Sequence, residues 1–313
     1  MKKLTDEEFL ADFPVLGSGG IAKKYGMAER AVLGRRRRLE ERTGTVLAQP
    51  STTLAQQQHS AIKKLDIPDG VVIVASDAHY WPGEPTAAHR ALIHFLKKIK
   101  PVAVIANGDM FDGASISRWP RVNFEERPKV HEELEVVQLR MGEIIKASPR
   151  AIHIWNLGNH DSRFETFLAA KAPEFERVPG FTLKDHFKDW TPAWSTHVNG
   201  HTVIKHRGVS GGQHAPFMNT LRTGWNIVTG HLHSGKVYPY TDMHGSRYGF
   251  DNGFLSHRLH PAFINYTEAG FPDWRSGFGH LTFREGRLMW PEFVHVLDEE
   301  AGLVEFRGEL INV

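Results

Sequence analysis

Five short apolar runs, each followed at once by acidic, amide or imidazole side chains, constrain the fold of this chain more than any other feature of its sequence. The runs have the length and the Val, Ile and Ala content of buried strands, and segments of helical periodicity separate several of them. The polar groups that follow the runs are Asp77 and His79; Asp109 and Asp112; Asn159, His160 and Asp161; His206; and His231 and His233. Because ligands collect outside the carboxyl ends of strands in α/β sheets, we expect these side chains to meet in one cleft.

The order of the expected elements is that of an α/β protein. Strands are expected at 71–75, 102–106, 152–157, 202–205 and 227–229, and amphipathic helices at 85–100 and 129–147. Gly158 is expected to allow a sharp turn, and the capping-box spacing of Ser162 and Glu165 predicts the start of another helix. Residues 172–200 have no clean periodicity and are expected to form an irregular insertion. Residues 279–313 alternate apolar and polar side chains, so antiparallel strands are expected there.

The composition is that of an ordinary globular protein with an excess of histidine. The chain has 313 residues, 19 of them His and none of them Cys, with a net charge of +2. Without cysteine, a metal ion would have to be held by oxygen and nitrogen atoms. The acidic N-terminus does not resemble a signal peptide, and no apolar run approaches the roughly 18 residues of a membrane span. We therefore expect a cytoplasmic protein that does not cross a membrane.

The N-terminal part predicts a small basic helical module. Residues 21–32 have the rhythm of a helix-turn-helix, with a turn at Gly26 and an apolar anchor at Val32. Residues 20–43 contain eight Lys or Arg against three Asp or Glu, which suits contact with phosphates. We expect residues 1–43 to form this module, with DNA as a partner of the basic residues 23–42, and residues 44–68 to form a linker. A solvated charged helix on a small helical cap is equally consistent, and Gly34 weakens the expectation of a recognition helix.

The donor types at the five strand ends narrow the choice of metal. Carboxylate, imidazole and amide oxygen together suit Mn²⁺, Fe or Zn²⁺ better than Mg²⁺ or Ca²⁺, which prefer shells of oxygen alone. A single histidine after a strand is usually an ordinary surface or core residue. Five strand ends with the same kind of side chain are not explained in that way.

At these residues the chain resembles the calcineurin-like metallophosphoesterase superfamily, from about Val71 to His233. The motifs are Asp-x-His, Gly-Asp-x-x-Asp, Gly-Asn-His-Asp, a single His, and Gly-His-x-His. The resemblance implies an α/β fold, a four-layer αββα sandwich at residues 69–313, with two divalent transition metals at its centre. Mn²⁺ is the preferred metal, with Fe, Zn²⁺ or Ni²⁺ as alternatives. It also implies the ligands: Asp77, His79 and His233 for the first metal, Asn159, His206 and His231 for the second, and Asp109 as a bridge.

The resemblance further implies three catalytic residues. His160 would lie beside the metals and protonate the departing alkoxide, and Asp112 would orient it. Arg163 stands where the phosphoprotein phosphatase branch carries an arginine that clamps phosphate, although an exposed arginine in a first helical turn is equally consistent. Gly113, where those phosphatases have arginine, and Asp161, where they have glutamate, favour nuclease-like and phosphodiesterase relatives.

Three functions remain open from the sequence. The preferred one is a metal-dependent hydrolase of phosphodiester bonds that processes DNA, and the alternative is a phosphomonoesterase acting on a protein or a small molecule. A DNA-binding regulator with a degenerate catalytic scaffold is the third, and the intact ligand set argues against it. Trp81, Trp119 and Phe111 lie near ligand loops, where they could stack on a base or pack in the core.

Overall fold

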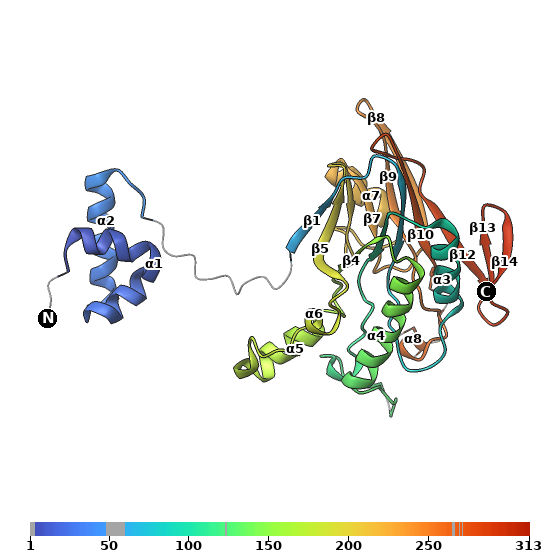
Figure 1. Ribbon diagram of the computed structural model, residues 1–313, viewed down its shortest axis with the longest axis horizontal. Coiled ribbons are helices and arrows are strands. Elements are labelled where there is room, and N and C mark those ends of the chain that lie inside the picture. The colour runs from blue at the N-terminus through green and yellow to red at the C-terminus, as the bar shows by residue number, and fades with distance from the viewer. Residues whose placement is uncertain (1–3, 48–59, 123, 265–266, 269, 271) are drawn as a thin grey trace. The chain divides into compact units, whose positions relative to one another are not determined.

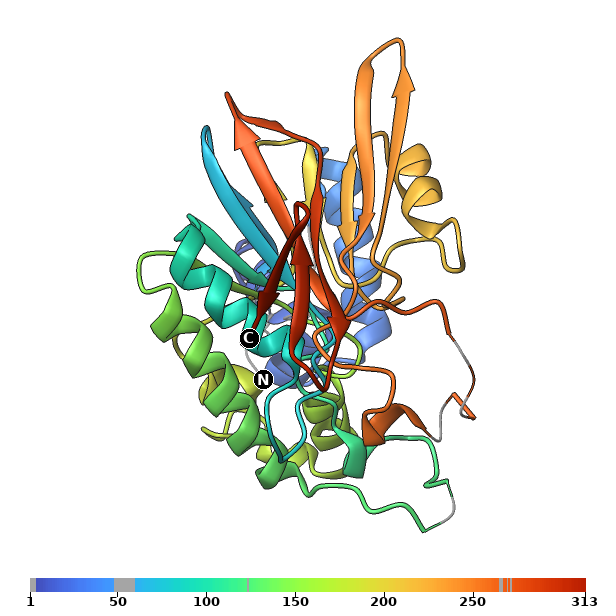
Figure 2. The same ribbon diagram turned by 90° about the vertical axis from the view of Figure 1, so that its right-hand side faces the viewer.

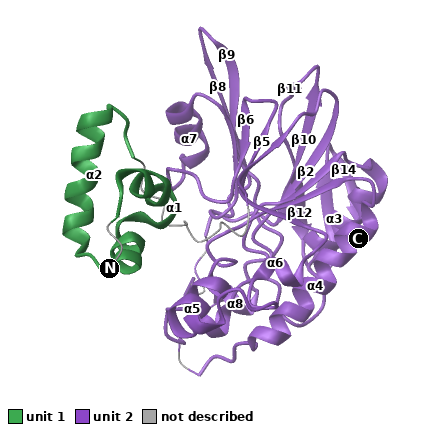
Figure 3. Cartoon of the chain, turned by 60° about the vertical axis from the view of Figure 1, so that its left-hand side comes forward, with its two compact units in different colours: residues 1–58 green, residues 59–313 purple. Residues whose placement is uncertain are grey.

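The structure is a computed structural model that describes residues 4–47, 60–122, 124–264, 267–268, 270 and 272–313. The chain forms two compact units, residues 1–58 and residues 59–313 (Figure 3). Part of the expected linker, residues 48–59, lies outside the described residues. Its C-terminal part was predicted wrongly, because Ser60–Leu65 forms strand β1 and pairs in parallel with β5 (Thr191–Val198). This strand is polar because most of it is exposed, and its sequence therefore resembles that of a linker.

The N-terminal unit is helical, in agreement with the sequence. It contains α1 (Asp6–Tyr25) and α2 (Glu29–Thr43). Gly17 has φ 67° and ψ −176°, which interrupts α1, so three helical segments pack together. Their buried apolar side chains form one core, made of Leu4, Phe9, Phe13, Ile21, Val32, Leu39 and Leu47. The left-handed Gly26 ends α1 where the turn was expected.

The larger unit is built on a mixed sheet. In the described part of the chain, fourteen strands belong to this sheet, and the main path runs β14-β13-β12-β10-β2-β3-β4-β5-β6-β7-β9-β8. Strands β2 to β5 are parallel to one another, as are β6, β7 and β9, and β5 and β6 are antiparallel. The remaining strands are β2 (Gly70–Ala75), β3 (Ala103–Ala106), β4 (Ile152–Asn156), β6 (Thr202–Ile204), β7 (Asn226–Thr229), β8 (Lys236–Asp242), β9 (Gly245–Asp251), β10 (Gly277–Arg284), β11 (Arg287–Leu288), β12 (Glu292–Asp298), β13 (Leu303–Phe306) and β14 (Glu309–Asn312).

The helices of the larger unit lie outside the sheet. They are α3 (Ala87–Ile99), α4 (Val130–Ala147), α5 (Arg163–Lys171), α6 (Leu183–His186), α7 (Ala215–Thr223) and α8 (Pro261–Ile264), with short 3₁₀ turns η1 (Ala114–Ile116) and η2 (Pro173–Phe175). Helices α3 and α4 lie on one side of the sheet and α7 on the other (Figures 1 and 2). None of the helices in the described ranges combines the length and the apolar character needed to cross a bilayer.

Two apolar cores separate the layers. Along β2, Val72 and Val74 face a core shared with strands from β3 to β10, which lies between the two halves of the sheet. Ile73 and Ala75 point the other way, into the core under α3 and α4. Burial of both faces explains why β2 is a continuous apolar run. The α/β fold with helices outside a folded sheet, expected from the sequence, is confirmed.

The segment 172–200 differs from the expectation of an irregular insertion. It contains α6 and β5, and β5 joins the two halves of the sheet by pairing with β4 and β6. Pro192, Trp194 and the polar residues of β5 do not form a clear strand pattern, so the sequence did not predict this strand. The expected capping box is also wrong, because Ser162 has helical φ and ψ and its Oγ donates to the carbonyl of Asn159.

Candidate metal centre

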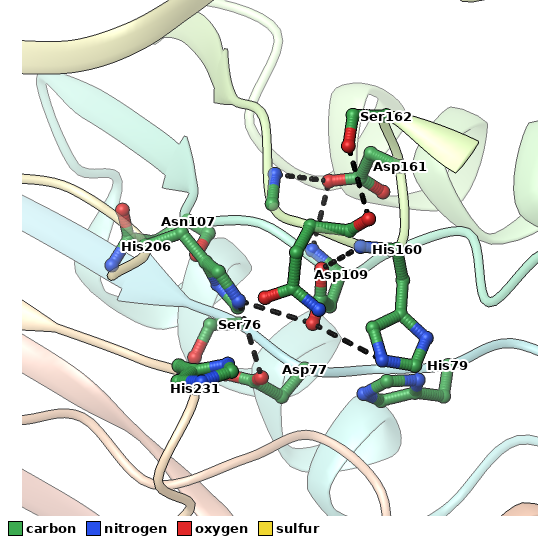
Figure 4. Close-up of polar contacts among 12 residues, drawn as sticks. Ser76, Asp77, His79, Asn107, Asp109, His160, Asp161, Ser162, His206 and His231 are labelled. Carbon is green, nitrogen blue, oxygen red and sulfur yellow. Dashed lines mark hydrogen bonds and ion pairs between the residues drawn. The ribbon is translucent and has the colours of Figure 1, made fainter. Parts of the chain in front are cut away.

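The predicted ligands lie two to four residues beyond the ends of five strands. Asp77 follows β2, Asp109 follows β3, Asn159 follows β4, His206 follows β6 and His231 follows β7. Figure 4 shows side chains from these loops pointing toward a common centre, with Asp109 between His206 and His160. The structure therefore brings together residues that are up to 156 positions apart, since Asp77 and His233 are in hydrogen-bond contact.

The first expected ligand set is one compact cluster. Asp77, His79 and His233 each offer a donor atom, and these atoms lie within 4.8 Å of one another. His233 Nε2 is 3.1 Å from Asp77 Oδ1. His79 uses Nδ1 for a 3.0 Å contact with Asp112, while its buried Nε2 has no hydrogen-bond partner among the described residues. An unpartnered buried nitrogen is costly, and a metal ion would satisfy it.

The second set is a neighbouring cluster. Asp109, His206 and His231 also have donor atoms within 4.8 Å of one another. His206 donates from Nδ1 to the carbonyl of Asn107 (2.9 Å), which directs Nε2 to 3.0 Å from Asp109 Oδ2. In the part of the chain that is described, Asn159 Oδ1 is buried without a hydrogen-bond partner. His206 Nε2 is also 4.0 Å from Asp77 Oδ1, so the two clusters adjoin.

The protonation states suit cation binding. Burial opposes ionisation of Asp77, but the neighbouring His206 and His233 outweigh it and lower the pKa of Asp77 to about 2. Burial lowers the pKa of His231 to about 4, so this imidazole is neutral. Burial also disfavours charge on His206, yet Asp109 and Asp77 raise its pKa to about 10. Asp77 therefore supplies negative charge and His231 a neutral imidazole, whereas His206 would have to release its proton to bind a cation.

The backbone at the ligands is strained in a way the sequence did not reveal. Five of the seven predicted ligands have left-handed φ values: Asp77 56°, His79 44°, Asp109 53°, His231 72° and His233 61°. This conformation costs roughly 1 kcal/mol or more for a residue other than glycine, and it persists where surrounding contacts enforce it. Such strain is concentrated at functional sites in proteins.

The glycines of the motifs make room for ligands from other motifs. A Cβ on Gly158 would lie 2.0 Å from Asp109 Oδ1, and one on Gly230 would lie 2.5 Å from Asp77 Oδ2. A Cβ on Gly108 would lie 2.4 Å from the His206 ring. Gly158 has no positive φ, so its role is close approach, and the sequence-based explanation by a sharp turn was incomplete.

His160, Asp112 and Arg163 form a connected group beside the clusters. His160 Nδ1 is 2.6 Å from Asp112 Oδ1, and Nε2 is 3.9 Å from Asp109 Oδ2. Burial lowers the pKa of His160, but Asp109 and Asp112 outweigh it, so the pKa is raised overall. Arg163 donates to the carbonyl of Asp112 (2.9 Å) and lies 3.1 Å from His160 Nε2. Arg163 is thus half-buried and engaged, unlike the exposed arginine that was one alternative.

Glu133 is a residue of this region that the sequence analysis missed. It lies on α4 and accepts hydrogen bonds from the backbone N–H groups of Gly113 (3.1 Å) and Ala114 (3.2 Å), directly after Asp112. Burial, followed by the nearby Asp112 charge, raises the pKa of Glu133 to about 8. An acidic residue in an amphipathic helix gives no signal of such a contact.

The clusters open into a cleft of about 640 Å³. Besides metal-cluster residues, its lining includes His160, Arg163 and Arg127, together with aromatic side chains. The cleft therefore combines a centre suited to cations with a wall suited to an organic substrate.

Fold and centre together define a metal-dependent hydrolase of phosphate esters. The sequence model of the calcineurin-like phosphoesterase family matches residues 70–257, more than half of the chain, and the chain belongs to this family. The family uses divalent metals, and the two clusters are its candidate ligands here.

The chain is similar to two phage proteins and to two solved structures. The chain is 26% identical over 250 residues to the gene 54 protein of Mycobacterium phage D29, covering 72% of this chain and 93% of that protein. It is 25% identical, with the same coverage, to the gene 54 protein of Mycobacterium phage L5. Two structures of Vps29 from Entamoeba histolytica, a single mutant and a wild type complexed with zinc, share 13% and 12% identity. They cover 78% and 75% of this chain and 99% and 96% of their own chains, with TM-scores of 0.37 and 0.38.

Proposed function

We propose that this phosphoesterase hydrolyses phosphodiester bonds, with DNA as its substrate. The observation that carries the preference for a diester is the state of the two arginines that line the cleft. The Arg163 guanidinium lies 3.7 Å from the Asp112 carboxylate, and Arg127 is paired with the Glu125 carboxylate, so both positive charges already have an acidic partner. A phosphomonoester carries an additional negative charge, which neither guanidinium is free to neutralise.

We propose two divalent cations, with Mn²⁺ preferred, in the two clusters. Asp77, His79 and His233 would hold one, Asn159, His206 and His231 the other, and Asp109 would contact both. This assignment is supported by the buried His79 Nε2 and Asn159 Oδ1, which lack hydrogen-bond partners among the described residues. When bound, such a cation pair would bind phosphoryl oxygens and lower the pKa of a water molecule, which would supply the attacking hydroxide.

The protein side chains would complete the reaction. As the bond from the attacking oxygen to phosphorus forms, the ester P–O bond opposite breaks, and the leaving oxygen takes a proton from His160. Asp112, 2.6 Å from His160 Nδ1, would hold the ring in position. Arg163 would hold the Asp112 backbone through its carbonyl, and the contact of Arg163 with His160 Nε2 would open when that nitrogen carries the proton for the leaving oxygen. A positioned acid of this kind contributes about 10²- to 10⁴-fold to the rate.

The test compares bis(p-nitrophenyl) phosphate with p-nitrophenyl phosphate, using the full chain with added Mn²⁺. We expect faster hydrolysis of the diester, and loss of activity and of bound metal in Asp109→Ala. Preference for the monoester would overturn the proposal in favour of a phosphomonoesterase.

The N-terminal unit would grip DNA as a helix-turn-helix, and its structure narrows the residues involved. Arg35 and Arg42 bond to Asp6, and Arg36 bonds to Glu40. In the described residues, Arg30, Arg37 and Arg38 of α2 have no ion-pair or hydrogen-bond partner, so these three are the ones available for phosphates.

Salt dependence of DNA binding tests this assignment. Each phosphate contact contributes about −0.9 to the slope of log K against log salt. Replacing Arg30, Arg37 and Arg38 by Gln in the full chain should make the slope less steep by about 2 to 3 units. Replacement of the exposed Lys97, Lys100 and Lys146 is the matched control and should leave the slope as it was. An equal slope in both triple variants would remove this unit from the DNA contact.

A further inference from the structure

The loop between η1 and α4 forms one wall of the catalytic cleft. Ser117, Trp119, Pro120, Val122 and Arg127 of this loop line the same cleft as the two metal clusters. A polymer held at the centre for hydrolysis would therefore lie against this loop.

Arg127 fixes the loop, whose described residues belong to no strand. Its guanidinium donates to the carbonyls of Ala114 (3.1 Å), Trp119 (3.3 Å) and Pro120 (3.1 Å), and it pairs with Glu125. Trp119 is thus presented on a backbone that is tied down on both sides of it.

Trp119 is too exposed to serve mainly in packing the protein interior. Its side chain is 62% exposed, and Phe124 of the same loop is fully exposed. The two other aromatic residues noted in the sequence have structural roles. Phe111 is buried against Phe164, and Trp81 donates from Nε1 to Asp112. Trp119 is therefore the most exposed of the three and the one whose ring has no structural role among these contacts.

The charges beside Trp119 indicate the kind of ligand. The Arg118 guanidinium lies 5.0 Å from the Trp119 ring centroid, and Arg121 is exposed two residues further along. An exposed aromatic ring with one guanidinium over a face and a second exposed arginine two residues away in the chain fits a nucleobase with its adjoining backbone phosphates. An apolar peptide would use the ring but leave both charges without partners.

We propose that Trp119 stacks on an unpaired nucleobase of single-stranded DNA next to the phosphate being cleaved, with Arg118 and Arg121 contacting the neighbouring phosphates. This inference rests on the proposed diesterase function and adds the substrate to it. Stacking needs a base that is free on one face, so the loop selects single-stranded substrate or an unstacked end.

The experiment compares hydrolysis of a single-stranded oligodeoxynucleotide with that of an abasic oligonucleotide of the same length and charge. Both carry the same phosphates, so contacts of the N-terminal unit and of the arginines cancel in the comparison. We expect the full-length wild type to prefer the base-bearing strand in kcat/KM by about fivefold to 100-fold, the range for one stacked base. Trp119→Ala should lose this preference, and Trp119→Phe should keep part of it.

Trp290→Ala is the matched control, because Trp290 is 56% exposed and does not line the cleft. It should keep the wild-type preference. The inference is overturned if Trp119→Ala discriminates between the two strands as wild type does, or if wild type treats them alike. Activity on bis(p-nitrophenyl) phosphate without activity on either strand would also overturn it while leaving the diesterase function in place. Activity on monoesters alone would overturn both.

Discussion

Asp161 holds the backbone on both sides of Asp109, the residue at the centre of the two clusters. Its Oδ2 accepts from the N–H of Asp109 (2.8 Å), and its Oδ1 accepts from the N–H of Phe111 (3.0 Å). Gly158 N–H and the Trp155 indole also donate to Oδ2. The final aspartate of the Gly-Asn-His-Asp motif thus connects two motifs and offers no atom to the candidate metal clusters. Its buried carboxylate receives four N–H donors.

Asp161→Asn should therefore weaken metal binding without removing a ligand. An amide has one acceptor oxygen, and its NH₂ group would face an N–H donor, leaving buried donors unpaired at a cost of about 1–3 kcal/mol. Outer contacts of this kind typically change metal affinity by about 10- to 100-fold. Calorimetric titration with Mn²⁺ measures the change, with the exposed Asp189→Asn as control. Equal affinity in the two variants would show that Asp161 does not position Asp109.

Gly158→Ala should abolish metal binding and turnover by displacing Asp109. The added Cβ would lie 2.0 Å from Asp109 Oδ1 and 2.6 Å from its backbone nitrogen, so a ligand has to move. Gly142→Ala is the matched control, since Gly142 lies within α4 and an added Cβ meets no atom within 4 Å. It should gain about 0.5–1 kcal/mol in stability. Metal content and denaturation are measured for both variants. A fully metallated Gly158→Ala would show that the added Cβ does not displace Asp109.

The elements nearest the centre could be predicted from the sequence because local signals determine them. Apolar runs such as 71–75 have both faces buried, so the strand is visible without knowledge of its neighbours. Polar residues that directly follow such runs in the chain must lie at the ends of the strands. Helix α4, expected at 129–147, spans Val130–Ala147 for the same reason, namely one apolar face at helical spacing.

What could not be predicted depends on contacts distant in sequence. The need for glycine at 230 comes from Asp77, and the neutralisation of Arg42 comes from Asp6. Strand β5 was missed because its neighbours in the sheet, and not its own mixed residues, make it a strand. The left-handed backbone of Asp77 is likewise enforced by surrounding groups, and side-chain identity does not reveal it.

His160→Ala should retain metal and lose rate in a manner that depends on the leaving group. The ring lies beside Asp109 but belongs to neither proposed ligand set, so metal content should match that of wild type. For a poor alkoxide leaving group the rate should fall by about 10²- to 10⁴-fold, and for p-nitrophenolate by much less, because that leaving group needs no proton. The exposed His131→Ala is the control. A uniform loss across leaving groups would rule out the acid role.

The contact between the buried His89 and the partly exposed Glu143 makes the fold sensitive to acid, independently of the metal centre. His89 lies on α3, with Nδ1 2.8 Å from the Tyr80 hydroxyl and Nε2 2.8 Å from Glu143. These contacts fit a neutral imidazole that accepts from Tyr80 and donates to Glu143. Burial outweighs the attraction of Glu143 and lowers the pKa of His89 from 6.5 to about 4.

Stability should therefore be full above pH 6.5 and fall as the pH approaches 4, because in that window the unfolded chain binds a proton that the folded chain does not. Between pH 6.5 and 5 the loss from His89 should reach about 2 kcal/mol. Glu143, whose pKa is lowered by its contacts with His89 and Arg140 against the opposing effect of burial, acts in the same direction. Urea denaturation of metal-free protein measures the loss, and His89→Gln should reduce it, whereas His94→Gln, exposed on the same helix, should not. An unchanged pH dependence in His89→Gln would show that this histidine is not the group being titrated.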